Sequence, residues 1–169
     1  QQNKDSDVRS LLSKAMALAP SKPEPRLALI RYLTNRKDLK GALSAASDAV
    51  RALPGNADAL SMAGQLQIGL GQKKEAIATF KRLVALQPRS TRPQIMLANA
   101  LFVSGDRAGA AGVLNAAATL EPSSGDVCAA QINLMFAQGD ADGAVNKAKA
   151  YQTANPGAAA DILLADTLV

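Results

Sequence analysis

Five prolines recur along this chain at a constant interval of 34 residues, with no insertion or deletion between them. They are Pro20, Pro54, Pro88, Pro122 and Pro156. A fixed period of this length is typical of proteins in which helical hairpins of equal size stack in a row. The spacing therefore predicts a repetitive scaffold, because each hairpin covers the apolar side of its neighbour.

The prolines divide the chain into four complete units with a half unit at either end. The complete units are 23–56, 57–90, 91–124 and 125–158, and the half units are 1–22 and 159–169. Proline cannot donate a backbone hydrogen bond, and it disfavours helical geometry in the residue before it. Each proline therefore predicts the end of a second helix, and we expect all six segments to form one solenoid domain.

Glycine and aspartate predict the turn between the two helices of a unit. The fifteenth position of the last three units is glycine, namely Gly71, Gly105 and Gly139. A residue just beyond a helix end commonly adopts a left-handed conformation, which costs glycine little. Asp106 and Asp140 follow, where a carboxylate can accept hydrogen bonds from the free N–H groups that open the next helix. The first complete unit has Lys37 in place of the glycine.

These signals, together with apolar residues at helical spacing, predict about ten helices. The expected helices are 6–19, 25–36, 40–53, 57–69, 73–87, 92–104, 108–121, 126–138, 141–154 and 159–168. Hydrophobic residues make up 48% of the chain but aromatic residues only 3%, which favours small and aliphatic side chains between closely packed helices. The sequence therefore predicts an all-α solenoid.

The order of small and bulky residues within the period resembles the tetratricopeptide repeat (TPR). The second complete unit carries the pattern best, with Gly64, Gly71, Ala76, Phe80 and Pro88. The bulky aromatic residue that the family usually has at the fourth position is replaced by Arg26, Leu60, Gln94 and Cys128. The resemblance covers nearly the whole chain, and it implies a right-handed superhelical solenoid of antiparallel helix pairs.

The fourth complete unit departs from the pattern of the others. Tyr151 stands at a position that is normally small, and Gln131 and Ile132 look shifted relative to the other units. We therefore expect irregular packing near Tyr151.

The resemblance also implies that the first helices line a concave groove, with ligand contacts at fixed positions of each unit. The candidate groove residues are Arg31, Gln65, Asn99 and Asn133 at the ninth position, Ile68, Phe102 and Phe136 at the twelfth, and Leu27 and Ile95 at the fifth. Amide and guanidinium groups can hydrogen-bond a peptide backbone whatever its sequence. A polar strip beside an apolar one suits an extended peptide or an amphipathic helix.

A structural interpretation of the same residues stays open beside this one. Asn99 and Asn133 can instead hydrogen-bond neighbouring turns, and Phe102 and Phe136 can pack between units as ordinary core.

Catalytic and metal sites find little support in the sequence. The chain has no histidine and one cysteine, Cys128, which stands at a packing position of a helix. The serines of the chain have no evident neighbouring residue that could activate them as nucleophiles. Asp140 and Asp142 stand at a helix start, where the free N–H groups already explain carboxylates. We therefore expect a non-catalytic scaffold for a protein or peptide, with no cofactor and no metal.

Charge is distributed unevenly along the chain. Residues 1–92 carry 16 Lys and Arg against 7 acidic residues, whereas residues 93–169 carry 3 against 7. The basic half could steer an acidic partner or polysaccharide, or it could be an ordinary solvated surface. The strongest contributors would be Arg26, Arg31, Arg36, Lys37 and Lys40. No nucleic-acid partner is expected, because aromatic residues for base stacking are not interleaved with the basic ones.

The half units at both ends predict that the chain is a fragment of a longer array. Their helices can dock head to tail between copies, or they can fray. We expect no transmembrane segment, since no apolar run reaches 18 residues.

Two stretches, LVALQP at 83–88 and YQTANPGAAADILLAD at 151–166, carry a further resemblance. They resemble the large TPR-repeat lipoprotein that accompanies bacterial PEP-CTERM exosortase and exopolysaccharide gene clusters. This implies, as an alternative function, an envelope component that supports exopolysaccharide export or PEP-CTERM protein sorting. The implied location is the periplasm or an anchor in the outer membrane; without this resemblance we would expect the cytoplasm.

Overall fold

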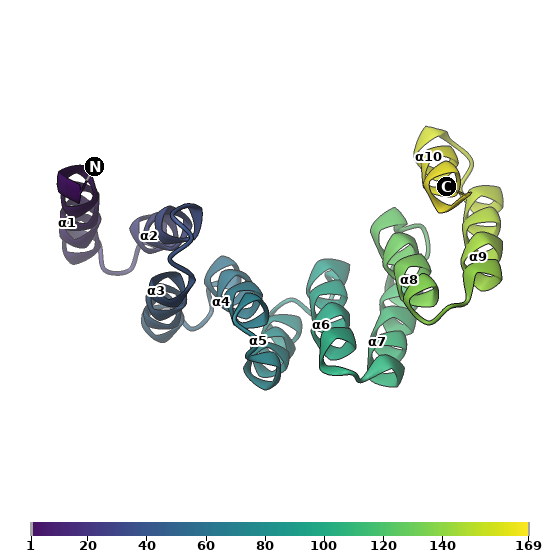
Figure 1. Cartoon of the computed structure of the whole chain (residues 1–169), viewed down its shortest axis with the longest axis horizontal. Coiled ribbons are helices and arrows are strands. Elements are labelled where there is room, and N and C mark those ends of the chain that lie inside the picture. Colours follow the sequence, from purple (N-terminus) through teal and green to yellow (C-terminus); the bar gives the residue numbers. More distant parts are fainter. Residues whose placement is uncertain (1, 169) are drawn as a thin grey trace. The chain divides into compact units, whose positions relative to one another are not determined.

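A computed structural model describes residues 2–168 of the chain, and all of the regular structure in that range is helical (Figure 1). The helices are α1 (Gln2–Leu18), α2 (Glu24–Asn35), α3 (Leu39–Ala52), α4 (Ala57–Gly69), α5 (Lys73–Leu86), α6 (Thr91–Ser104), α7 (Arg107–Leu120), α8 (Gly125–Ala137), α9 (Ala141–Ala154) and α10 (Ala158–Leu168). The prediction of an all-α chain of about ten helices is confirmed. The expected boundaries agree with the observed ones to within a few residues.

The chain forms two compact units that divide between Pro88 and Arg89. The first unit contains α1 to α5, and the second contains α6 to α10. Inside each unit the helices of a repeat pack as hairpins, α2 with α3 and α4 with α5, then α6 with α7 and α8 with α9. The expectation that the repeats form one solenoid domain stays a prediction.

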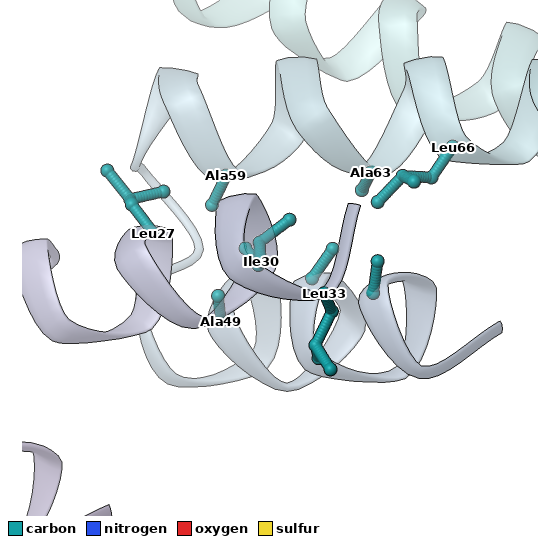
Figure 2. Close-up of a cluster of buried hydrophobic side chains, with 9 residues drawn as sticks. Leu27, Ile30, Leu33, Ala49, Ala59, Ala63 and Leu66 are labelled. Atoms are coloured by element: carbon teal, nitrogen blue, oxygen red, sulfur yellow. The ribbon is translucent and has the colours of Figure 1, made fainter. Parts of the chain in front are cut away.

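A core cluster of the first unit combines long side chains of α2 and α4 with alanines of α3 and α4. Leu27, Ile30 and Leu33 of α2 and Leu66 of α4 gather with the alanines in one buried cluster (Figure 2). The alanines are Ala42, Ala46 and Ala49 of α3, and Ala59 and Ala63 of α4. Small side chains allow the helices to approach closely, and the leucines and Ile30 fill the remaining space.

Two buried positions of the repeat compensate each other in size. The eighth position, on the first helix, and the twenty-fourth, on the second helix, pair as Ile30 with Ala46, Gly64 with Phe80, Ala98 with Leu114, and Ile132 with Ala148. All eight residues are buried. A large side chain on one helix thus stands with a small one on the other in every complete repeat, which keeps the packed volume nearly constant.

The end of each first helix follows the prediction made from glycine. Gly71, Gly105 and Gly139 have φ angles of 75°, 98° and 82°, in the left-handed region. Lys37 holds the equivalent position of the first repeat with φ 61°. The turn geometry of the repeat is therefore kept even where the sequence supplies a residue that this conformation disfavours.

Aspartate caps three of the second helices, as expected for Asp106 and Asp140. The bonds run from the backbone N–H of Gly41 to Asp38, of Gly109 to Asp106, and of Gly143 to Asp140, with N···O distances of 2.9, 2.8 and 2.9 Å. Gln72 stands at the same place before α5 and makes no such bond. Each capping carboxylate satisfies one of the N–H groups that a helix start leaves free.

The fourth repeat makes polar side-chain contacts through Tyr151 and Gln131, and the irregular packing expected there stays a prediction. The Tyr151 hydroxyl donates a hydrogen bond of 2.8 Å to the carbonyl oxygen of Ser123, in the turn before α8. Gln131 is buried, and its Nε2 donates to Asn115 Oδ1 of α7 at 2.9 Å. The fourth repeat therefore replaces some apolar contacts with directional polar ones.

Lys37→Gly is expected to raise the free energy of unfolding by about 0.5–1 kcal/mol, because glycine adopts the left-handed conformation without a Cβ penalty. Chemical denaturation of the purified protein measures this change. Lys37→Ala is the matched control, since it removes the same charge and keeps the Cβ. An equal gain from both variants would show that charge, not backbone geometry, is responsible.

Gly64→Ala is expected to lower the free energy of unfolding by about 1–2 kcal/mol, despite the better helix propensity of alanine. A Cβ at Gly64 would lie 2.5 Å from Cε1 of the buried Phe80 ring. Adding Phe80→Leu to this variant copies the Ala98 and Leu114 pair of the next repeat, so it should recover part of the loss. Urea titration of the two single variants and the double variant tests this compensation. If the changes in the free energy of unfolding of the single variants simply add in the double variant, the compensation is disproved.

Candidate functional site

A groove of about 370 Å³ lies in the second unit, between the first helices α6 and α8. Ile95, Asn99 and Phe102 come from α6, and Asn133 comes from α8. Leu114 of α7 and Leu134 of α8 add to the apolar lining. The structure thus brings together four of the residues that the sequence singled out.

Helical spacing explains why these side chains share one groove. Asn99 follows Ile95 by four residues and Phe102 follows Asn99 by three, so the three residues lie along one face of α6. Asn133 lies one period after Asn99, on the equivalent face of α8. Because α6 and α8 are in contact, the two amides belong to the same surface.

The amides of Asn99 and Asn133 are exposed, and none of the described residues forms a hydrogen bond with them. The alternative interpretation, in which they hydrogen-bond neighbouring turns, therefore does not describe the structure. Each amide keeps two N–H donors and a carbonyl acceptor for a ligand. Phe102 is half-buried and lines the groove.

A second groove of about 280 Å³ lies in the first unit, between α2 and α4. It contains the predicted residues Arg31 and Gln65, and Met62 and Leu66 contribute apolar surface. Asn35 also lines it and was missed by the sequence reasoning. A signal existed, because Asn35 stands at the thirteenth position, which the family resemblance also associates with ligand contacts.

Three of the predicted groove residues lie elsewhere. Leu27 is only 6% exposed and belongs to the buried cluster of the first unit, so it contributes to stability and not to the groove surface. Ile68 is half-buried on α4 and does not line the groove. Phe136 is 41% exposed on α8, also outside the lining, so it is neither core nor groove wall.

Cys128, the one thiol, is poorly suited to chemistry. Its side chain is 3% exposed, and burial raises its pKa, an effect that the positive charge of Lys147 partly offsets. A thiol with a raised pKa holds little of the nucleophilic thiolate at neutral pH. Cys128 packs with Ile132, Ala144 and Ala148 instead.

Metal binding and membrane crossing are two further possibilities. Among the residues whose side chains the structure describes, 6–168, no three Cys, Asp or Glu side chains lie close enough together to hold a metal ion. None of the helices described in residues 2–168 combines the length and the apolar character that a membrane crossing requires.

Comparison with known proteins identifies the fold. Residues 33–101 match the tetratricopeptide repeat family. A search of curated protein sequences gives no significant match. Several solved structures resemble most of the chain at low sequence identity, which shows that its fold is that of TPR proteins.

Three of these structures illustrate the likeness. TTC0263, a thermophilic TPR protein of Thermus thermophilus, has a TM-score of 0.72 and 19% identity, over 94% of this chain and 88% of its own. MamA from Desulfovibrio magneticus RS-1 has a TM-score of 0.71 and 17% identity, over 88% of this chain and 84% of its own. YrrB, a TPR protein with an unusual peptide-binding site, has a TM-score of 0.64 and 20% identity, over 92% of this chain and 81% of its own.

Proposed function

We propose that this chain, a solenoid of the tetratricopeptide repeat superfamily, is a non-catalytic scaffold that binds an extended peptide in the groove of its second unit. The observation that carries the proposal is the pair of exposed amides, Asn99 and Asn133, beside an apolar lining and without hydrogen-bond partners among the described residues. TPR scaffolds generally bind proteins and peptides, and do not catalyse reactions.

The two kinds of surface in this groove suit the two parts of an extended peptide. Peptide N–H and C=O groups can pair with the carboxamides, which offer donors and acceptors together. Side chains of an extended peptide alternate between its two faces, so one set can enter the apolar lining of Ile95, Phe102 and Leu134. The groove volume of about 370 Å³ falls within the usual range of ligand sites.

A protein with the same fold lends this proposal support. YrrB is a TPR protein with a peptide-binding site, so a solenoid of this architecture is able to hold a peptide. The identity of the ligand for the present chain would depend on its own groove residues.

Replacing Asn99 and Asn133 together with alanine is expected to weaken peptide binding at least tenfold and to leave the melting temperature nearly unchanged. The first effect follows from the loss of two amide contacts, and the second from the absence of partners for these exposed side chains. The probe is an uncharged apolar peptide selected from a random display library, and its affinity is measured by fluorescence polarisation.

Asn146→Ala is the matched control, because Asn146 is an exposed amide on α9 that does not line the groove. It should leave both the melting temperature and the peptide affinity unchanged. The proposal would be wrong if the Asn99 and Asn133 variant lost stability as well, or if the library yielded no peptide that depends on these two residues.

We also propose that α10 binds α1 of a second copy, which would build a composite repeat. Ile162 and Leu168 of α10 are 61% and 60% exposed, whereas Cys128 and Leu134, one period earlier, are 3% and 9% exposed. On α1, Val8, Leu12 and Ala15 are half-buried, although their counterparts Ala42, Ala46 and Ala49 are at most 1% exposed. In complete repeats, first and second helices cover each other. The corresponding sides of α10, which is a first helix, and α1, which is a second helix, stay partly exposed.

Sedimentation equilibrium tests this self-association over a range of protein concentrations. The average mass is expected to rise with concentration, and Ile162→Glu should abolish the rise because it places a charge in the proposed contact. Ala150→Glu, at an exposed site of α9 whose counterpart Ala116 one period earlier is exposed as well, is the control and should retain association. A constant monomeric mass for the unmodified chain would refute the contact.

The resemblance to the PEP-CTERM-associated lipoprotein stays a prediction, as do the envelope role and location that it implies.

A further inference from the structure

We propose that the groove of the first unit is a second binding site with a different specificity, for an extended acidic peptide whose carboxylate pairs with Arg31. This inference rests on the proposed function, since it assigns the same mode of backbone binding to another groove. The first groove differs from the second in the class of ligand, because the positive charge of Arg31 selects an acidic peptide.

The surface of this groove has a polar rim and an apolar floor. Arg31, Asn35 and Gln65 supply the polar groups, and Leu39, Met62 and Leu66 supply the apolar ones. The apolar floor favours a peptide that carries aliphatic side chains over an acidic polysaccharide, which would leave this surface without a matching partner.

Arg31 has its charge available for a ligand. It is exposed, and it forms no ion pair with any described residue. Among the residues whose side chains are described, no aspartate or glutamate lines the groove. A guanidinium group in this situation offers a planar pair of donors that fits the two oxygens of a carboxylate.

The acidic residue that follows α2 does not neutralise Arg31, because both of its oxygens are engaged elsewhere. Asp38 Oδ1 accepts the backbone N–H of Gly41 at 2.9 Å, and Asp38 Oδ2 pairs with Nη2 of Arg9 at 3.3 Å. The charge of the segment adds to that of Arg31, because residues 1–88 carry 14 Lys and Arg against 7 acidic residues. An acidic ligand would therefore be attracted to this unit and held at Arg31.

The groove of the second unit has the opposite character. Asn99 and Asn133 stand at the repeat position that Arg31 and Gln65 hold in the first groove, and no charged side chain among the described residues lines the second groove. Residues 89–169 carry 5 basic residues against 7 acidic ones. The two grooves share their location on the repeat but would select ligands of different charge.

The experiment compares two peptides of equal length with blocked ends, one alternating leucine with glutamate and the other leucine with glutamine. Fluorescence polarisation with the full chain at low salt should show tighter binding of the glutamate peptide. Arg31→Gln, which installs the amide found at Gln65, should weaken that binding about fivefold and leave the glutamine peptide unaffected. Added salt should reduce the difference between the two peptides.

Lys81→Gln is the matched control, because it removes one exposed positive charge from α5 of the same unit, outside the groove. It should change the affinity for the glutamate peptide by less than about twofold, since an exposed charge outside the groove contributes little. Circular dichroism should give both variants the melting temperature of the unmodified chain, because the two side chains are exposed.

Three results would overturn the inference. The two peptides could bind equally well, or Arg31→Gln and Lys81→Gln could weaken binding of the glutamate peptide equally. Alternatively, oligogalacturonate, an acidic polysaccharide tested beside the peptides, could be the only ligand whose binding depends on Arg31. These failures differ from a failure of the proposed function. If this inference alone fails, a selected apolar peptide still binds through Asn99 and Asn133, whereas if the proposed function fails, that peptide does not bind there.

Discussion

Alanine at the twentieth position of each repeat sets how closely the two helices of a hairpin approach. Ala42, Ala76, Ala110 and Ala144 are all at most 1% exposed. A larger side chain at these sites would have to displace a neighbouring helix, because protein interiors hold few voids. The hairpin therefore depends on a side chain no larger than a methyl group at this position. The paired eighth and twenty-fourth positions fill the space that remains.

This packing leaves the opposite side of the first helices free for recognition. Arg31, Gln65, Asn99 and Asn133 hold the ninth position of successive repeats, and all four are exposed. Because none of them is needed to fill the core, their chemistry can change between repeats at little cost in stability. A scaffold of constant geometry can in this way present a guanidinium group in one unit and neutral amides in the other.

The repeat pattern predicted the helices, their turns and the caps at Asp106 and Asp140, because these depend on local backbone chemistry at fixed positions. It was less reliable for burial. Leu27 and Ile95 share the fifth position, yet Leu27 is buried in a cluster and Ile95 lines a groove. A position in the period fixes the direction of a side chain, whereas its exposure depends on the volumes of residues on neighbouring helices.

The polar contacts of the fourth repeat connect this packing to the candidate site. Close apolar packing already restricts how α8 lies against α7, and a directional polar contact between the two helices adds a further constraint on their register. The hydrogen bond from Gln131 to Asn115 at 2.9 Å is satisfied at one register only. Gln131 lies two residues before Asn133 on the same helix, so fixing its register also fixes Asn133. Burying a glutamine, at the desolvation cost that this entails, thus holds one of the two groove amides in place.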